Sequence, residues 1–69
     1  MSQRVYFLGV GGTLMGSLAL LAKEFGFDVA GSDGPIYPPM SGQLANAGIR
    51  VDQGFAPSNL DPTPDKVVI

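Results

Sequence analysis

Apolar and polar positions alternate in short blocks along the 69 residues of the chain. The first apolar block, Arg4 to Leu8, is bounded by glycine and is typical of a strand that is covered on both faces. The segments Asp28–Asp33, Ile49–Gln53 and Lys66–Ile69 have a similar character, and the first of them ends in a polar pair. We therefore expect four short strands.

A longer segment, from about Gly12 to Phe25, has the spacing of an amphipathic helix. At about 100° per residue its apolar side chains fall on one broad arc, which we expect to face the core. That arc holds Leu14, Met15, Leu18, Ala19, Leu21, Ala22 and Phe25. The opposite side holds Gly16, Ser17, Lys23 and Glu24, with Leu20 as its one apolar residue.

A second helix is predicted to begin at Pro38 or Pro39, because a proline in the first turn loses no helical hydrogen bond, and to run to about Ala47. Gly26 and Gly48 follow the two helices, each with an apolar residue after it. This pattern predicts that each helix ends in a Schellman motif, with the glycine in the left-handed conformation.

Strands and helices that alternate with such short connections require parallel pairing and right-handed crossovers. We expect an α/β fold with a parallel sheet in the order 3-2-1-4, a Rossmann-like arrangement that forms one nucleotide-binding half of a doubly wound fold. Residues 56–65 hold at most one helical turn before their prolines and aspartates break it. Since the fourth strand has only begun at Ile69, we interpret residues 1–69 as one incomplete N-terminal domain, truncated in or after that strand.

The segment between the first strand and the first helix, "GVGGT", lies where ligands bind in such a sheet. Gly9 allows a tight turn, and Gly11 and Gly12 place no Cβ in the way of a ligand. The N–H groups of Gly12, Thr13 and Leu14 at the start of the helix favour an anion. The alternative is that the glycines only let the helix pack closely on the sheet, a role for which we expect Gly16.

Asp33 ends the second strand, where an acid can accept hydrogen bonds from ribose hydroxyls. The alternative is that this carboxylate caps a turn in "SDG". Three further acids, Asp52, Asp61 and Asp65, are interpreted as solvated residues in loops or at strand ends, and Tyr37 either stacks on a base or anchors its loop.

The amino-acid composition limits the reactions, ligands and partners that the chain can have. The chain has no cysteine and no histidine, which removes disulfides, thiol catalysis and the commonest metal ligand. Its four basic residues, Arg4, Lys23, Arg50 and Lys66, belong to the sheet edge opposite the glycine loop, so a phosphate would be held by backbone amides. The net charge of −2 argues against nucleic acid, and neither a membrane span nor an export signal is visible, so we expect a cytoplasmic protein.

The segments "FLGVGGTLMGSLA" and "GFDVAGSD" resemble the N-terminal domain of the Mur ligases that use UDP-N-acetylmuramate. "YPPMS" and "QLANAGI" are similar to the murein-peptide branch of that family. The resemblance implies a diphosphate at Gly11, Gly12, Thr13 and Leu14, and uridine at Asp33 and Gly34. Leu14 departs from the glycine that is common in the alanine-adding relatives.

The resemblance implies a share in an ATP-dependent ligase that joins a recycled murein tripeptide to UDP-N-acetylmuramate in peptidoglycan recycling. ATP and Mg²⁺ would be held by central and C-terminal domains, and we expect neither a catalytic residue nor a metal ligand in these 69 residues. The glycine motif alone equally permits the NAD(P)-binding half of an oxidoreductase, or a non-catalytic module that senses a nucleotide.

Overall fold

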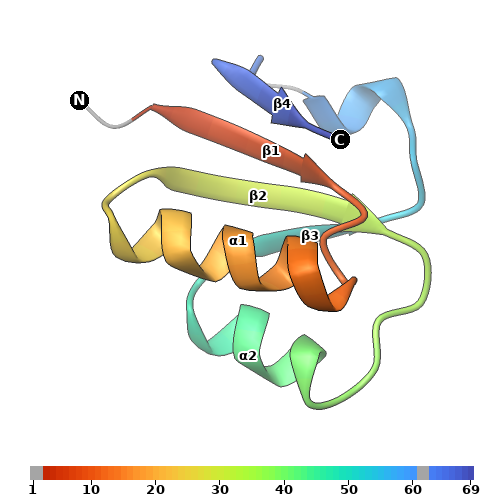
Figure 1. The fold of residues 1–69 in the computed structure, drawn as a ribbon. Helices are drawn as coiled ribbons and strands as arrows, with labels where there is room; N and C mark the ends of the chain where they lie inside the picture. The colour runs from red at the N-terminus through yellow and green to blue at the C-terminus, as the bar shows by residue number, and fades with distance from the viewer. Residues whose placement is uncertain (1–2, 61–62) are drawn as a thin grey trace.

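The computed structural model describes residues 3–60 and 63–69, and these form a single sheet with two helices on one of its faces (Figure 1). Asp61, expected to be solvated, lies outside the described residues. The elements in chain order are β1 (Arg4–Leu8), α1 (Thr13–Glu24), β2 (Asp28–Asp33), α2 (Met40–Asn46), β3 (Arg50–Gln53), the 3-10 turn η1 (Pro57–Leu60) and β4 (Lys66–Val68).

The sheet has the order β3-β2-β1-β4 with every neighbouring pair parallel, which confirms the predicted topology. Its register is continuous, since Tyr6 pairs with Ala30 of β2 and Ala30 pairs with Arg50 of β3. Parallel strands place their carboxyl ends at a common edge, so the loops that follow β1, β2 and β3 lie together. Within the described ranges, neither helix has the length and apolarity needed to cross a bilayer.

The core lies between the sheet and the two helices. Strand residues that point toward the helices alternate with residues that point to the opposite face of the sheet, which we call the far face. The buried apolar side chains of this layer are Val5, Phe7, Val10, Ala19, Val29, Leu44 and Ile49.

Helix α1 packs on the sheet through a face that overlaps only part of the predicted arc. Met15, Ala19 and Ala22 of that arc contact the core, and so does Leu20, which was expected on the opposite side. Gly16 and Ala19 are its buried residues, whereas Leu14, Leu18, Leu21 and Phe25 are 72%, 41%, 47% and 74% exposed. A Cβ on Gly16 would stand 2.6 Å from the Met40 sulfur and 3.0 Å from the carbonyl oxygen of Val10. Gly16 and Ala19 therefore face the sheet and α2 because small residues let the backbones approach, and Leu14, Leu18 and Leu21 are left outside.

Both helices end as the glycines predicted. Gly26 has φ +95°, and the amide of Phe27 donates to Ala22 O over 3.1 Å. Gly48 has φ +76°, and the amide of Ile49 donates to Leu44 O over 3.1 Å. These are the long-range bonds of Schellman motifs, in which left-handed glycine turns the chain directly into the next strand.

Candidate functional site

The loop between β1 and α1 is tied to the end of β2. Gly9 has φ +77°, a conformation that favours glycine, and it turns the chain out of β1. The amides of Gly9 and Val10 both donate to Ser32 O, over 2.8 and 3.1 Å. A Cβ on Gly31 would stand 2.7 Å from Val10 Cβ, so glycine is required on β2 for the loop to lie this close. Sequence analysis did not identify this role of Gly31.

The amide donors that remain at the start of α1 differ in part from those expected. Gly12 N donates to Gly9 O over 3.1 Å and is therefore not free, which corrects the expectation for that group. The first helical hydrogen bond is that from Gly16 N to Gly12 O, so helix geometry leaves Thr13, Leu14 and Met15 without intrahelical acceptors for their N–H groups. These three donors carry the positive end of the helix dipole, which suits an anion.

Gly11 and Gly12 have different surroundings. A Cβ on Gly11 would lie 2.8 Å from Asp33 Oδ2 and 2.7 Å from Ile36 Cγ1, so its missing side chain makes room for the protein itself. A Cβ on Gly12 would meet only Gly9 O, at 3.4 Å. Of these two glycines, Gly12 therefore has the more open position, beside the free donors of α1.

The Asp33 carboxylate is directed at the glycine loop. Its Oδ2 accepts from Gly11 N over 2.8 Å, and its Oδ1 accepts from Gly34 N over 2.7 Å. Gly54 N, at the end of β3, donates to the carbonyl oxygen of Asp33 over 2.8 Å. The turn-capping role considered for this acid is thus present, and each carboxylate oxygen keeps a further lone pair for a ligand.

Two aromatic side chains are exposed on the loops that follow β2 and β3. Phe55 comes directly after Gly54 and is 64% exposed, and Tyr37 is 72% exposed. At this degree of exposure Tyr37 does not anchor its loop by burial, which was one of its two expected roles. Phe55 was not selected from the sequence, although an apolar residue placed just after a strand of this edge was a usable signal.

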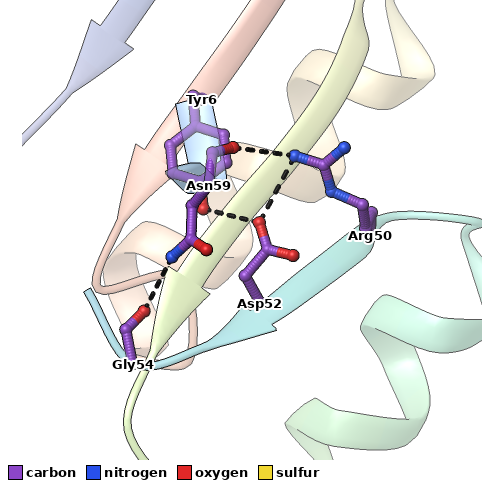
Figure 2. Close-up of polar contacts among 5 residues, drawn as sticks. All are labelled: Tyr6, Arg50, Asp52, Gly54 and Asn59. Atoms are coloured by element: carbon purple, nitrogen blue, oxygen red, sulfur yellow. Dashed lines mark hydrogen bonds and ion pairs between the residues drawn. The ribbon is translucent and has the colours of Figure 1, made fainter. Parts of the chain in front are cut away.

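The far face carries a polar network that the sequence analysis missed (Figure 2). Tyr6 donates its hydroxyl hydrogen to Asp52 Oδ2 over 2.8 Å, and Arg50 Nη2 lies 3.3 Å from the same oxygen. Arg50 also donates to Asn59 O over 3.0 Å, and Asn59 Nδ2 donates to Gly54 O over 3.0 Å. The side chain of Asp52 is 24% exposed, so the expectation that it is simply solvated is wrong.

This environment changes the acidity of Tyr6, which is 3% exposed. Burial raises the pKa of its hydroxyl above the ordinary value of 10.0, and the Asp52 carboxylate raises it further. The neighbouring Ser32 hydroxyl and the Arg50 guanidinium oppose part of this rise. The phenol therefore remains protonated and serves as a donor over the physiological pH range.

The basic residues do not supplement the amide donors. Arg4 lies 3.6 Å from Asp28 at the amino end of the sheet, and its amide donates to Asp65 Oδ2 over 2.7 Å. Arg50 is committed to the far-face network. Three cavities, of about 170, 310 and 210 Å³, are lined by residues outside Gly11–Leu14. Gly12, Thr13 and Leu14 are exposed, so the candidate anion site is an open surface of backbone donors.

Comparison with known proteins matches the chain to one family. The model described as "Mur ligase family, catalytic domain" matches residues 4–69. UDP-N-acetylmuramate–L-alanyl-γ-D-glutamyl-meso-2,6-diaminoheptandioate ligase from Escherichia coli K12 is 50% identical over 66 residues, which cover 96% of this chain and 14% of the relative. The ligase of the same name from Haemophilus influenzae is 40% identical over 67 residues, covering 97% of this chain and 15% of the relative.

A solved structure agrees with this result. The crystal structure of a murein peptide ligase from Psychrobacter arcticus 273-4 superimposes with a TM-score of 0.94 at 51% sequence identity. The match covers 97% of this chain and 14% of the solved one. The chain therefore spans a small fraction of the length of the proteins that it matches.

Proposed function

The chain belongs to the Mur ligase family, as the match over residues 4–69 shows, and from this premise we propose that it binds the UDP part of UDP-N-acetylmuramate. The single observation that carries the proposal is the arrangement of the carboxyl edge. There the free amides at the start of α1 stand beside a glycine without a Cβ and next to an acid that ends β2. A diphosphate needs the free amides, and a ribose needs the acid.

In this proposal the diphosphate lies over the Gly11–Leu14 segment. The N–H groups of Thr13 and Leu14 donate to its oxygens, and Gly12 lets it approach the backbone. Asp33, with the Gly34 backbone beside it, receives the uridine. Arg4 and Arg50 are paired with acids, Lys23 lies in the last turn of α1 and Lys66 begins β4, so the amides and the helix dipole provide the attraction.

We extend the proposal, on the same premise, to the reaction in which this domain would take part. We propose that residues 1–69 are an N-terminal domain that orients UDP-N-acetylmuramate for an ATP-dependent ligase. Further domains would hold ATP and Mg²⁺ and accept a murein tripeptide, in peptidoglycan recycling. The identity to two ligases named for the L-alanyl-γ-D-glutamyl-meso-diaminoheptandioate peptide supports this choice of peptide.

The test is a binding titration of the chain with UDP-N-acetylmuramate, UDP and NAD, repeated with Gly12→Val. Gly12 has φ −70° and ψ 149°, which valine adopts readily, so the fold should tolerate the change while the new side chain occupies the diphosphate position. We expect at least roughly tenfold weaker UDP binding, about 1.4 kcal/mol.

The matched control is Gly42→Ala on α2, where a Cβ meets nothing within 4 Å, and its UDP affinity should equal that of the unchanged chain. Equal UDP affinity in folded Gly12→Val would contradict the proposed site. Tighter binding of NAD than of UDP would favour the oxidoreductase alternative.

A further inference from the structure

Asp33 connects the three loops that meet at the carboxyl edge. Its carboxylate joins Gly11 of the β1–α1 loop, 22 residues earlier, to Gly34 of the β2–α2 loop. Its carbonyl oxygen accepts from Gly54, which opens the segment after β3. No single neighbouring residue could replace these bonds, because they use both carboxylate oxygens and the main chain of one position.

The carboxylate and Gly11 fit each other closely. A Cβ at Gly11 would stand 2.8 Å from Asp33 Oδ2, so any other residue there would push the acid away from the amide that it accepts. Gly11 is followed directly by Gly12, the N-cap of α1. Because the N-cap is a glycine, no N-cap side chain holds the start of the helix. The Asp33–Gly11 bond thus fixes the loop immediately before the free amides of the helix.

We propose that Asp33 is a positioning residue, which holds the glycine loop in the form that binds diphosphate and so couples the uridine and diphosphate parts of the site. This inference rests on the proposed function. Two N–H donors use two of the carboxylate's roughly four acceptor positions, which leaves acceptors for ribose hydroxyls. One carboxylate can therefore organise the loop and contact the nucleoside together.

Simple electrostatics and the positioning role predict opposite effects of Asp33→Asn on the binding of phosphates. A carboxylate beside an anion site repels the anion, so Asp33→Asn, which removes the charge, should strengthen binding of phosphates relative to uridine. In the positioning role, Asp33→Asn keeps one acceptor oxygen but presents an NH₂ group to one of the two amides, and the loop loses a bond. Binding should then weaken, and weaken more when the ligand carries the diphosphate.

The experiment measures the affinities of uridine, UMP and UDP for the chain and for its variants. For Asp33→Asn we expect UDP affinity to fall about tenfold further than uridine affinity. Gly11→Ala keeps the Asp33 carboxylate in the chain but pushes it away from the loop. This variant should show the same excess loss of UDP affinity. The matched control is Asp28→Asn, which removes the same charge at the opposite edge and should leave all three affinities unchanged.

A ligand-free measurement separates this inference from the proposed function. In the unchanged chain the Gly11 amide should be protected from hydrogen exchange, and Asp33→Ala, which removes both acceptor oxygens, should remove that protection, whereas Asp28→Ala should not. Equal losses for uridine and UDP, or tighter UDP binding in Asp33→Asn, would overturn the positioning role. If UDP does not bind the unchanged chain, the proposed function fails, and unaltered Gly11 exchange in Asp33→Ala then overturns the positioning role on its own.

Discussion

Tyr6 and Asp52 form a hydrogen bond of 2.8 Å although their strands are not neighbours in the sheet. Strand β2 runs between them, and Ser32 of β2 pairs in register with Asp52. Ser32 is fully buried and small, so the phenol can extend over β2 and reach the carboxylate. The bond therefore ties β1 to β3 across the far face, at the end of the sheet that carries the candidate site.

Removing the Tyr6 hydroxyl should destabilise the fold. Tyr6→Phe keeps the buried ring but leaves Asp52 without one of its two donors, and a bond to a charged acceptor contributes roughly 1.5–3 kcal/mol. We expect a loss near the lower value, because Asp52 retains Arg50 and part of its hydration. Urea unfolding of the variant measures this loss. The control is Tyr37→Phe at an exposed position, which should change stability by less than about 0.5 kcal/mol.

The same tyrosine predicts how stability depends on alkaline pH. Its pKa in the folded chain is raised above the ordinary value of 10.0, chiefly by burial. Near pH 10 the unfolded chain then releases this proton more readily than the folded chain. The stability that the protonated Tyr6 hydroxyl contributes is fully present below its pKa in the unfolded chain and is lost as pH rises through its pKa in the folded chain. Melting temperatures should therefore fall between pH 8 and pH 11, a range that extends about one unit or more on either side of that value. The fall should be smaller in Tyr6→Phe. An identical decline in both chains would contradict this assignment.

Two glycine substitutions should change the stability of the fold in opposite directions. At Gly31 a Cβ would stand 2.7 Å from the carbonyl oxygen of Phe7, a backbone atom that cannot move without distorting β1. We expect Gly31→Ala to cost at least about 2 kcal/mol. At Gly42, on the exposed side of α2, alanine meets nothing within 4 Å and should stabilise the helix by about 0.5–1 kcal/mol. Thermal unfolding of both variants tests this, and a tolerated Gly31→Ala would show that both β1 and the loop after it can move away from β2.

Much of the fold could be predicted because it depends on local patterns. The strand order follows from short connections between alternating strands and helices, and the helix ends follow from Gly26 and Gly48. The buried face of α1 could not be predicted in the same way. Hydrophobicity places Leu18 and Leu21 inside, but the close approach of α1 to α2 at Met40 has room only for a glycine.

The candidate site was predictable in position but only partly in detail. Gly9 and Asp33 lie at the carboxyl edge because the ends of parallel strands lie there. That Gly12 N is used within the turn, and that the Asp33 carboxylate accepts from Gly11, depends on side-chain direction and loop geometry, for which the sequence has no periodic signal. The Tyr6–Asp52 bond joins residues 46 positions apart and was hidden for the same reason.

The exposed leucines of α1 give the last prediction. Leu21→Gln replaces a side chain that is 47% exposed with another good helix former, so stability should change by less than about 0.5 kcal/mol. The reference is Leu44→Ala on α2, which removes a fully buried side chain and should cost about 2–5 kcal/mol. Urea unfolding of the two variants under the same conditions gives both values. A loss at Leu21 comparable to that at Leu44 would mean that the helix packs through the centre of its predicted apolar arc and that Gly16 is turned away from the sheet.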